Sequence, residues 1–295
     1  MRKLIALVLA MLCLTACSAA PAESPQQVNP DVPPVMAQVA LLPRDEVYTY
    51  QVEAETHEDA ATAEDGTPLA EYRFDLPFLK VYREDGSIVE EADSPRAESA
   101  LAVAEAFNEH FDKWAAAEEF DGLVRSAKED LAFHRAEGFD WFGGYMLELV
   151  TSVYQTEHLV SVSGTYCSYT GGAHPNTWLL GWNFDLETGV FFGPEGLAAD
   201  SASFQEAVHQ ELIRQAELVA AESEMAPEEY FWEDYREILA NWGSYAVWFD
   251  EDGMTVAFSP YELACYAAGV QIFELTYDWL KPHLSEHGCE VLDLT

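Results

Sequence analysis

The feature that most restricts the fold of this chain is a strict alternation of apolar residues between positions 178 and 186. The apolar residues at alternate positions are Trp178, Leu180, Trp182, Phe184 and Leu186. This period of two is typical of a β-strand with one face in a core. The segment ends at Glu187-Thr188-Gly189, where glycine permits the positive φ of a turn. We therefore expect Trp178, Trp182 and Phe184 to be buried on one face of a sheet.

Other strand signals are grouped before and after a helical region. Period-two patterns predict strands near residues 48–52, 71–82, 145–153, 160–166, 245–249, 254–258 and 271–275. Pro77 is expected to interrupt the second of these, because proline lacks the N–H of a ladder. Gly171-Gly172 and the run 250–253 are expected to form turns. Strands grouped apart from helices predict an α+β fold with antiparallel sheets and packed helices, arranged as two closely associated subdomains.

Helix signals lie between these groups of strands. Ser94-Pro95 is expected to open a helix with Ser94 as the N-cap, and a break near Asp121-Gly122 leads to a second helix that ends near Gly138. Ser203 and Glu206 have the spacing of a capping box. Pro227 is expected to start one further helix, which buries the apolar residues Phe231, Tyr235, Ile238 and Trp242. A short helix containing Trp279 and Leu280 is expected near the end of the chain.

The amino-terminal segment has the pattern of a secretory signal. Arg2 and Lys3 precede an apolar run over residues 4–14, which is too short for the roughly 20 residues of a membrane span. The following Leu14-Thr15-Ala16-Cys17 resembles the bacterial lipobox, which implies cleavage after residue 16 and acylation of Cys17. An ordinary secretory signal with a chance cysteine is the alternative. Residues 17–43 are rich in proline and alanine and predict a tether, so we expect a lipid-anchored protein on the extracytoplasmic face of the cell membrane.

The charge of the chain limits its partners. The sequence contains 53 Asp and Glu against 14 Lys and Arg, a formal net charge of −39, and loss of Arg2 and Lys3 with the signal would leave −41. Such a chain repels nucleic acid and anionic lipid and attracts cationic proteins. An acidic surface that serves solubility alone is the other explanation.

Sequence motifs for catalysis and metal binding are missing. The sequence has no H-E-x-x-H, no G-x-S-x-G, no P-loop and no G-x-G-x-x-G, so we predict no catalytic residue, metal or cofactor. His283 and His287 have the spacing of two ligands on a helix, but Gly288 is expected to end any helix there and to leave a polar tail. Acidic pairs such as Glu118-Glu119 are expected to be solvated.

Three cysteines remain after the signal and the lipidated Cys17. They are Cys167, Cys265 and Cys289. One disulfide among them is possible outside the cytoplasm. Because three is an odd number, at least one thiol is expected to be free or to pair between chains.

Two segments resemble a known family. Residues 166–176 (YCSYTGGAHPN) are followed by 182–189 (WNFDLETG), and residues 258–269 read FSPYELACYAAG. Both are similar to the extracytoplasmic domain shared by RsiV-type anti-sigma factors and the amino-terminal part of PdaC-type peptidoglycan deacetylases. The resemblance implies a PdaC-amino-terminal-like subdomain over residues 44–193 and an RsiV-carboxy-terminal-like subdomain over 194–295. In that family the domain binds and does not catalyse, and the anti-sigma members are receptors for C-type lysozyme, a strongly basic enzyme.

The chain departs from this family in three respects. It has no recognisable sigma-binding segment or membrane span, which puts direct regulation of a sigma factor in doubt. It has no deacetylase catalytic domain. It carries Cys265 where many relatives have proline.

The two motifs supply the candidate ligand-binding residues. These are Tyr169, Gly171, Gly172, His174, Asn176, Tyr261 and Tyr266. A structural turn around Gly171-Gly172, with His174 bonded to backbone, is the alternative. The expected function is that of an anchored binding lipoprotein for a cationic protein such as C-type lysozyme. The alternatives are an enzyme or accessory of peptidoglycan modification that acts on cell-wall glycan, and a structural envelope lipoprotein.

Overall fold

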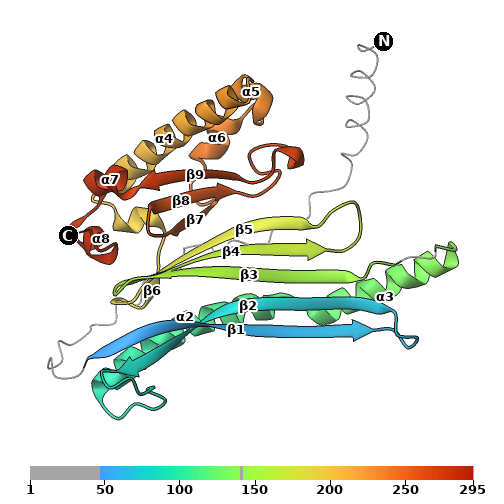
Figure 1. Ribbon diagram of the computed structural model, residues 1–295, viewed down its shortest axis with the longest axis horizontal. Helices are drawn as coiled ribbons and strands as arrows, with labels where there is room; N and C mark the ends of the chain where they lie inside the picture. Colours follow the sequence, from blue (N-terminus) through green and yellow to red (C-terminus); the bar gives the residue numbers. More distant parts are fainter. Residues whose placement is uncertain (1–46, 140–141, 295) are drawn as a thin grey trace. The chain divides into compact units, whose positions relative to one another are not determined.

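Two β-sheets and the helices packed on them make up the protein in the computed structural model, which describes residues 47–139 and 142–294 (Figure 1). All of these residues belong to one compact unit. The expected signal peptide, Cys17 and the whole of the expected tether lie outside the described residues. Within the described part, no helix is long and apolar enough to cross a membrane. The α+β class expected from the sequence is confirmed.

The larger sheet has six strands in sequence order. They are β1 (Tyr48–Thr62), β2 (Pro68–Arg83), β3 (Tyr145–Gln155), β4 (Leu159–Tyr169), β5 (Asn176–Asp185) and β6 (Val190–Phe191). Most neighbours are antiparallel, but β2 and β3 run parallel over Ala70–Phe74 and Tyr145–Leu149. The expected antiparallel pairing therefore holds for the other strand pairs described and is wrong for this one. Parallel neighbours need a long crossover, and the two helices between β2 and β3 provide it.

Pro77 does not interrupt β2, contrary to the expectation from the sequence. It stays in register opposite Ala54 of β1. Leu79 lies two positions after Pro77, so the nitrogens of both residues point to the same side of the strand. The Leu79 N–H donates to the Asn108 side chain at 2.7 Å and not to a neighbouring strand. Pairing with β3 has already ended at Phe74. The nitrogen of Pro77 thus faces an edge without a ladder partner, where the missing N–H costs little.

The crossover helices pack against this sheet. They are α2 (Pro95–Ala117) and α3 (Phe120–Ala136). Ser94 caps α2 as expected, because its hydroxyl accepts the N–H of Ala97 at 3.1 Å. Phe107 and Phe111 of α2 are fully buried with Phe184 of β5 in one apolar cluster. The break between the helices falls at Glu118 and Glu119, a few residues before the expected position.

The smaller sheet and its helices form the carboxy-terminal part. Its strands are β7 (Ala246–Phe249), β8 (Gly253–Phe258) and β9 (Gln271–Thr276). The helices that pack with them are η2 (Pro194–Leu197), α4 (Ser201–Glu222), α5 (Pro227–Tyr230), α6 (Tyr235–Ala240), η3 (Tyr266–Ala268), α7 (Tyr277–Leu280), η4 (Lys281–His283) and α8 (Glu286–Val291). As expected, β7 and β8 form a hairpin, whose turn is held by the Asp250 carboxylate on the N–H groups of Asp252 and Gly253.

Two helix boundaries in this part differ from the expectation. The N-cap of α4 is Asp200, whose carboxylate accepts the N–H of Ser203 at 2.7 Å, so the capping box on Ser203 is wrong. Asp200 has the extended backbone that a cap requires, whereas Ser203 already lies in the first turn. The helix that starts at Pro227 ends after one turn, and a second helix begins only at Tyr235.

The end of the chain is also ordered differently from the expected polar tail. Gly288 lies inside α8, and a Cβ there would come within 2.2 Å of the Leu197 carbonyl oxygen. Val291 and Leu292 are buried. Glycine is used here for close backbone packing and does not end the helix.

The two sheets meet through β5, which is covered on both faces. On one face Phe184 is fully buried against α2, while Trp178 and Trp182 are half-buried, so the expected burial holds fully only for Phe184. On the other face Gly181 lies directly against the backbone of Val247 in β7. The Asn183 amide donates to the Val247 carbonyl at 3.0 Å.

A second buried contact completes this junction. The Ser161 hydroxyl donates to the Asn183 side-chain oxygen at 2.8 Å and accepts the N–H of Phe249 at 2.7 Å. The buried polar groups are therefore paired with one another. This junction also sets the relative positions of the loops that follow β4 and β8.

Candidate functional site

The first motif forms the loop between β4 and β5. Gly171 and Gly172 have φ values of +97° and +98°, which side chains with a Cβ rarely adopt. The Tyr169 hydroxyl donates to the Gly172 carbonyl at 3.1 Å and closes the loop. Asn176 is exposed at the first position of β5, opposite Ser168. The turn predicted at the two glycines is confirmed.

The second motif forms the loop between β8 and β9. Tyr261 has φ +74°, an unusual value for a residue with a large side chain. The Glu262 carboxylate accepts the N–H of Ser259 at 2.6 Å, and the Ser259 hydroxyl in turn accepts the N–H of Leu179 at 3.0 Å. Burial raises the pKa of Glu262 above its usual value, although its bonds to Ser259 oppose this. These bonds hold the loop in place beside β5.

Three rings from the two loops meet and form what we call the aromatic platform: His174, Tyr261 and Tyr266. The His174 ring stacks on Tyr266 with a centroid distance of 3.8 Å and an interplanar angle of 14°. The centroid of the Tyr261 ring lies 5.4 Å from that of Tyr266 and 6.3 Å from that of His174. The side chain of Tyr261 is 54% exposed. Residues about 90 positions apart in the sequence thus form one accessible aromatic surface.

Backbone contacts position the platform. The Nδ1 atom of His174 lies 2.9 Å from the Pro175 carbonyl oxygen, within hydrogen-bond distance. The contact of His174 with backbone that the sequence offered as an alternative is therefore present, and the ring also stacks on Tyr266. The Trp232 indole N–H donates to the Tyr261 carbonyl at 3.0 Å. Trp232 is itself 38% exposed and extends the aromatic surface. The sequence pattern did not mark Trp232 as a binding residue, because it predicted one continuous helix there, whereas Trp232 lies between α5 and α6.

Exposed carboxylates flank Trp232. They belong to Glu228, Glu229, Glu233 and Asp234. The nearby Arg236 guanidinium is paired with Glu217 at 2.6 Å. The chain segment that carries Trp232 is therefore acidic, in keeping with the charge of the whole chain.

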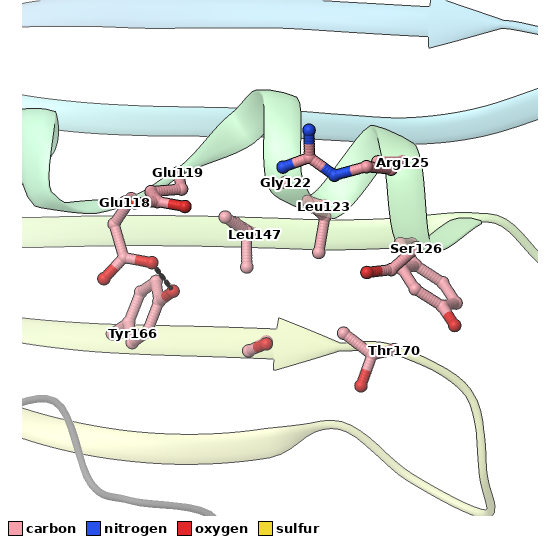
Figure 2. Close-up of a pocket in the computed structure, with 11 residues that line it drawn as sticks. Glu118, Glu119, Gly122, Leu123, Arg125, Ser126, Leu147, Tyr166 and Thr170 are labelled. Atoms are coloured by element: carbon pink, nitrogen blue, oxygen red, sulfur yellow. Dashed lines mark hydrogen bonds between the residues drawn. The ribbon is translucent and has the colours of Figure 1, made fainter. Parts of the chain in front are cut away.

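A groove lies between α3 and the ends of β3 and β4, and we call it the α3 groove. Its larger hollow has a volume of about 610 Å³, with Tyr145, Leu147, Tyr166, Ser168 and Thr170 on the strand side. Its wall includes Glu118, Glu119, Leu123, Arg125 and Ser126 of α3 and the turn before it (Figure 2). A smaller hollow of about 310 Å³ shares Tyr145 and Thr170 with the first and is also lined by Tyr169, Gly171 and Gly172.

The groove contains a hydrogen-bonded pair that the sequence did not predict. The Tyr166 hydroxyl donates to the Glu118 carboxylate at 2.6 Å (Figure 2). Burial, followed by this bond, raises the pKa of Tyr166 far above its usual value, so the hydroxyl keeps its proton. Glu118 is half-buried, and the expectation that the Glu118-Glu119 pair is fully solvated is wrong for Glu118.

All of the predicted ligand-binding residues except Asn176 thus fall into two places, and Asn176 lies outside both, exposed at the start of β5. His174, Tyr261 and Tyr266 form the aromatic platform, whereas Tyr169, Gly171 and Gly172 line the α3 groove. The loop between β4 and β5 is common to both.

Cysteines and histidines do not assemble a reactive or metal-binding group in the part of the chain that is described. Cys167, Cys265 and Cys289 carry free thiols. His287 lies 3.1 Å from the Asp185 carboxylate, while the His283 ring packs on Trp279. Among residues 47–139 and 142–294, no three potential ligands converge on a metal position.

Comparison with known proteins supports the fold and assigns no activity. Residues 191–278 match the sequence profile of a family described as "Protein of unknown function (DUF3298)". A member of the DUF3298 family from Bacteroides fragilis has a similar structure, with a TM-score of 0.54 and 13% identity over 83% of this chain and 97% of that chain. A DUF3298 family protein from Pseudomonas aeruginosa gives a TM-score of 0.47 and 13% identity over 81% of this chain and 95% of that chain. No curated protein matches the chain.

The profile match covers part of the candidate site. It includes Trp232 and the loop between β8 and β9, which carries Tyr261 and Tyr266. The loop between β4 and β5 lies before the matched residues. The similarity to the Bacteroides fragilis structure extends over most of the chain, and at 13% identity it concerns the fold alone.

Proposed function

We propose that this protein is a non-catalytic binding lipoprotein on the extracytoplasmic face of a bacterial cell membrane, and that it captures a cationic protein. One observation carries the proposal. The two sequence motifs meet in the aromatic platform, where Tyr261 is 54% exposed and Trp232 adjoins it. Tyrosine and tryptophan are enriched at the energetic centres of protein interfaces.

The charge defines the class of partner. A mature chain of net charge −41 attracts basic proteins over long range and repels acidic ones. Arginine and lysine side chains also bind the faces of tyrosine and tryptophan rings, most strongly when water is excluded. Exposed carboxylates beside Trp232 add short-range attraction for the same side chains. An aromatic surface with an acidic border therefore suits a basic partner.

Among basic proteins we propose C-type lysozyme. The support is the resemblance of residues 166–176 and 258–269 to the RsiV-type receptor domain. These are the segments that supply the three rings of the platform. In this proposal the lipid on Cys17 holds the receptor at the membrane, and lysozyme binding senses the enzyme or blocks its cleft.

Calorimetry with two basic proteins tests the proposal. The full chain in detergent is titrated with C-type lysozyme and, separately, with cytochrome c at about 0.15 M salt, where the Debye length is about 8 Å. We expect saturable binding of lysozyme and none of cytochrome c, because a shaped surface is needed in addition to charge. Equal binding of both would reduce the interaction to a non-specific acidic surface. Binding of neither would refute the lysozyme assignment.

Two matched variants locate the interaction. Tyr261→Ala should weaken lysozyme binding at least tenfold, about 1.4 kcal/mol, because an exposed platform ring is removed. Phe133→Ala removes an aromatic side chain of similar exposure, 57%, from α3 and should leave the affinity unchanged. Equal loss in both variants would contradict the location. Release of acetate from peptidoglycan by the purified protein would favour the alternative of a peptidoglycan-modifying enzyme.

A further inference from the structure

We propose that the α3 groove is a second binding site, separate from the platform, and that it takes a linear oligosaccharide of β-linked pyranose rings. Its two hollows, about 610 and 310 Å³, adjoin at Tyr145 and Thr170. Lining residues extend along α3 from Glu119 to His134, about 22 Å at about 1.5 Å of rise per residue. A long groove of this kind suits a chain and not a compact small molecule.

The lining combines rings with hydroxyl groups. Tyr145 and Tyr169 contribute half-buried aromatic rings on the strand side, next to the hydroxyls of Ser168 and Thr170, while Tyr166 is buried beneath them. Across the groove, Ser126 contributes a further hydroxyl. Pyranose rings have apolar C–H faces and a rim of hydroxyls, so they need both kinds of surface at once. Hydroxyl side chains can donate and accept, which matches the hydroxyl groups of a sugar.

The charged groups in the groove indicate which class of polymer could bind there. Glu118 accepts the Tyr166 hydroxyl at 2.6 Å, and the Asp130 carboxylate lines the smaller hollow together with Tyr145. Glu119 and Arg125 are exposed on the wall. Carboxylates outnumber guanidinium groups here, which disfavours phosphate polymers and nucleic acid. Carboxylates accept hydrogen bonds from sugar hydroxyls and amides, and Arg125 can donate to their oxygens.

This site does not depend on the proposed capture of a cationic protein. The platform rings belong to His174, Tyr261 and Tyr266, and none of them lines either hollow. The two surfaces share only the loop around Gly171 and Gly172. A change on α3 should therefore affect the groove and leave the platform intact.

The test uses the full chain in detergent, titrated by calorimetry with chitohexaose and with cellohexaose at millimolar concentration. Both sugars are linear chains of β-1,4-linked pyranose rings, and only chitohexaose carries acetamido groups. We expect saturable binding of at least one. Tighter binding of chitohexaose would identify the ligand of the groove as an amino-sugar polymer. Equal binding of the two sugars would show that the groove accepts β-linked glycans in general. Failure of both sugars to bind overturns the proposal, as does equal or tighter binding of a lysine hexapeptide.

Matched variants place the sugar in the groove. Ser126→Trp puts a large ring into the larger hollow and should weaken sugar binding at least tenfold while lysozyme binding is unchanged. Ala132→Trp adds the same ring at an exposed position of the same helix outside both hollows, and should bind sugar as the parent does. If Ser126→Trp unfolds at a lower temperature than Ala132→Trp, Thr170→Trp at the junction of the hollows replaces it. Sugar binding that survives the groove variant refutes the site.

Discussion

The junction between the two sheets offers a sharp test of the fold, through Gly181→Ala. Gly181 of β5 faces the backbone of Val247 in β7. A Cβ at position 181 would lie 2.2 Å from the Val247 carbonyl oxygen, 2.7 Å from its carbon and 2.8 Å from its nitrogen. All three are backbone atoms of a strand, so no flexible side chain can move aside. The smaller sheet would have to shift by about 1 Å to restore an ordinary contact.

The expected loss of stability follows from this shift. Overpacking of a core by one methyl group costs about 1–3 kcal/mol. The same shift would stretch the bond from Asn183 to the Val247 carbonyl, now 3.0 Å, and the bond from Phe249 to Ser161, now 2.7 Å. Loss of the hydrogen-bond partner of a buried polar group lowers the free energy of unfolding by about 1–3 kcal/mol more. We therefore expect Gly181→Ala to lower the free energy of unfolding by about 2–6 kcal/mol.

Urea unfolding followed by tryptophan fluorescence measures this loss. Gly196→Ala is the matched control, because the nearest atom to its Cβ, in Phe192, would be 3.8 Å away. The control should change stability by less than about 0.5 kcal/mol. A loss below about 1 kcal/mol for Gly181→Ala would show that β7 does not pack on β5 at this distance. The reasoning about the junction would then fail.

Three further predictions concern the anchor, the core and the pH dependence. Cys17→Ala should release the protein from the membrane fraction, since Cys17 is the expected site of lipid attachment; an uncleaved mutant that stays in the membrane would indicate a retained signal anchor. Trp182→Ala should cost about 3 kcal/mol, because the half-buried indole packs edge-on against Phe111 at 5.1 Å; a loss below about 1 kcal/mol in a urea melt would contradict this packing. Burial lowers the pKa of His110 to about 4, and its Nε2 has no hydrogen-bond partner among the described residues. Because the unfolded chain takes up this proton near pH 6.5, stability should fall by about 3 kcal/mol as the pH drops from about 6.5 to 4, and His110→Phe should lose this component of the pH dependence.

Much of the local structure was readable from the sequence because its causes lie within a few residues. The cap formed by Ser94 before Pro95 and the turn at Gly171-Gly172 depend on side-chain chemistry and on φ at those positions alone. The alternation after Trp178 likewise defines a strand and its two faces. The two motifs that contain the platform residues were also recognisable from the sequence. Their sequence did not indicate whether the three rings would be in contact.

Where competing local signals were close together, the sequence was ambiguous. Asp200 and Ser203 are both good N-cap residues, and only the extended backbone at Asp200 decides between them. Gly288 can end a helix or permit close packing, and the nearby Leu197 carbonyl selects the second role. In each case the deciding atom belongs to the folded surroundings of the residue.

Other features depended entirely on contacts between distant segments. Pro77 is accepted in β2 because β3 diverges after Phe74, and a parallel neighbour cannot be inferred from the pattern of either strand. Glu118 gains its tyrosine partner only when α3 lies over β4, which also forms the groove.

The sequence by itself determined most of the strands and helices, the acidic charge and the choice of candidate ligand-binding residues. Tertiary structure alone decided that His174 stacks on Tyr266 and that β5 is covered on both faces. The physical reason is that periodicity reports which side of an element is apolar and carries no information about which other element will cover it.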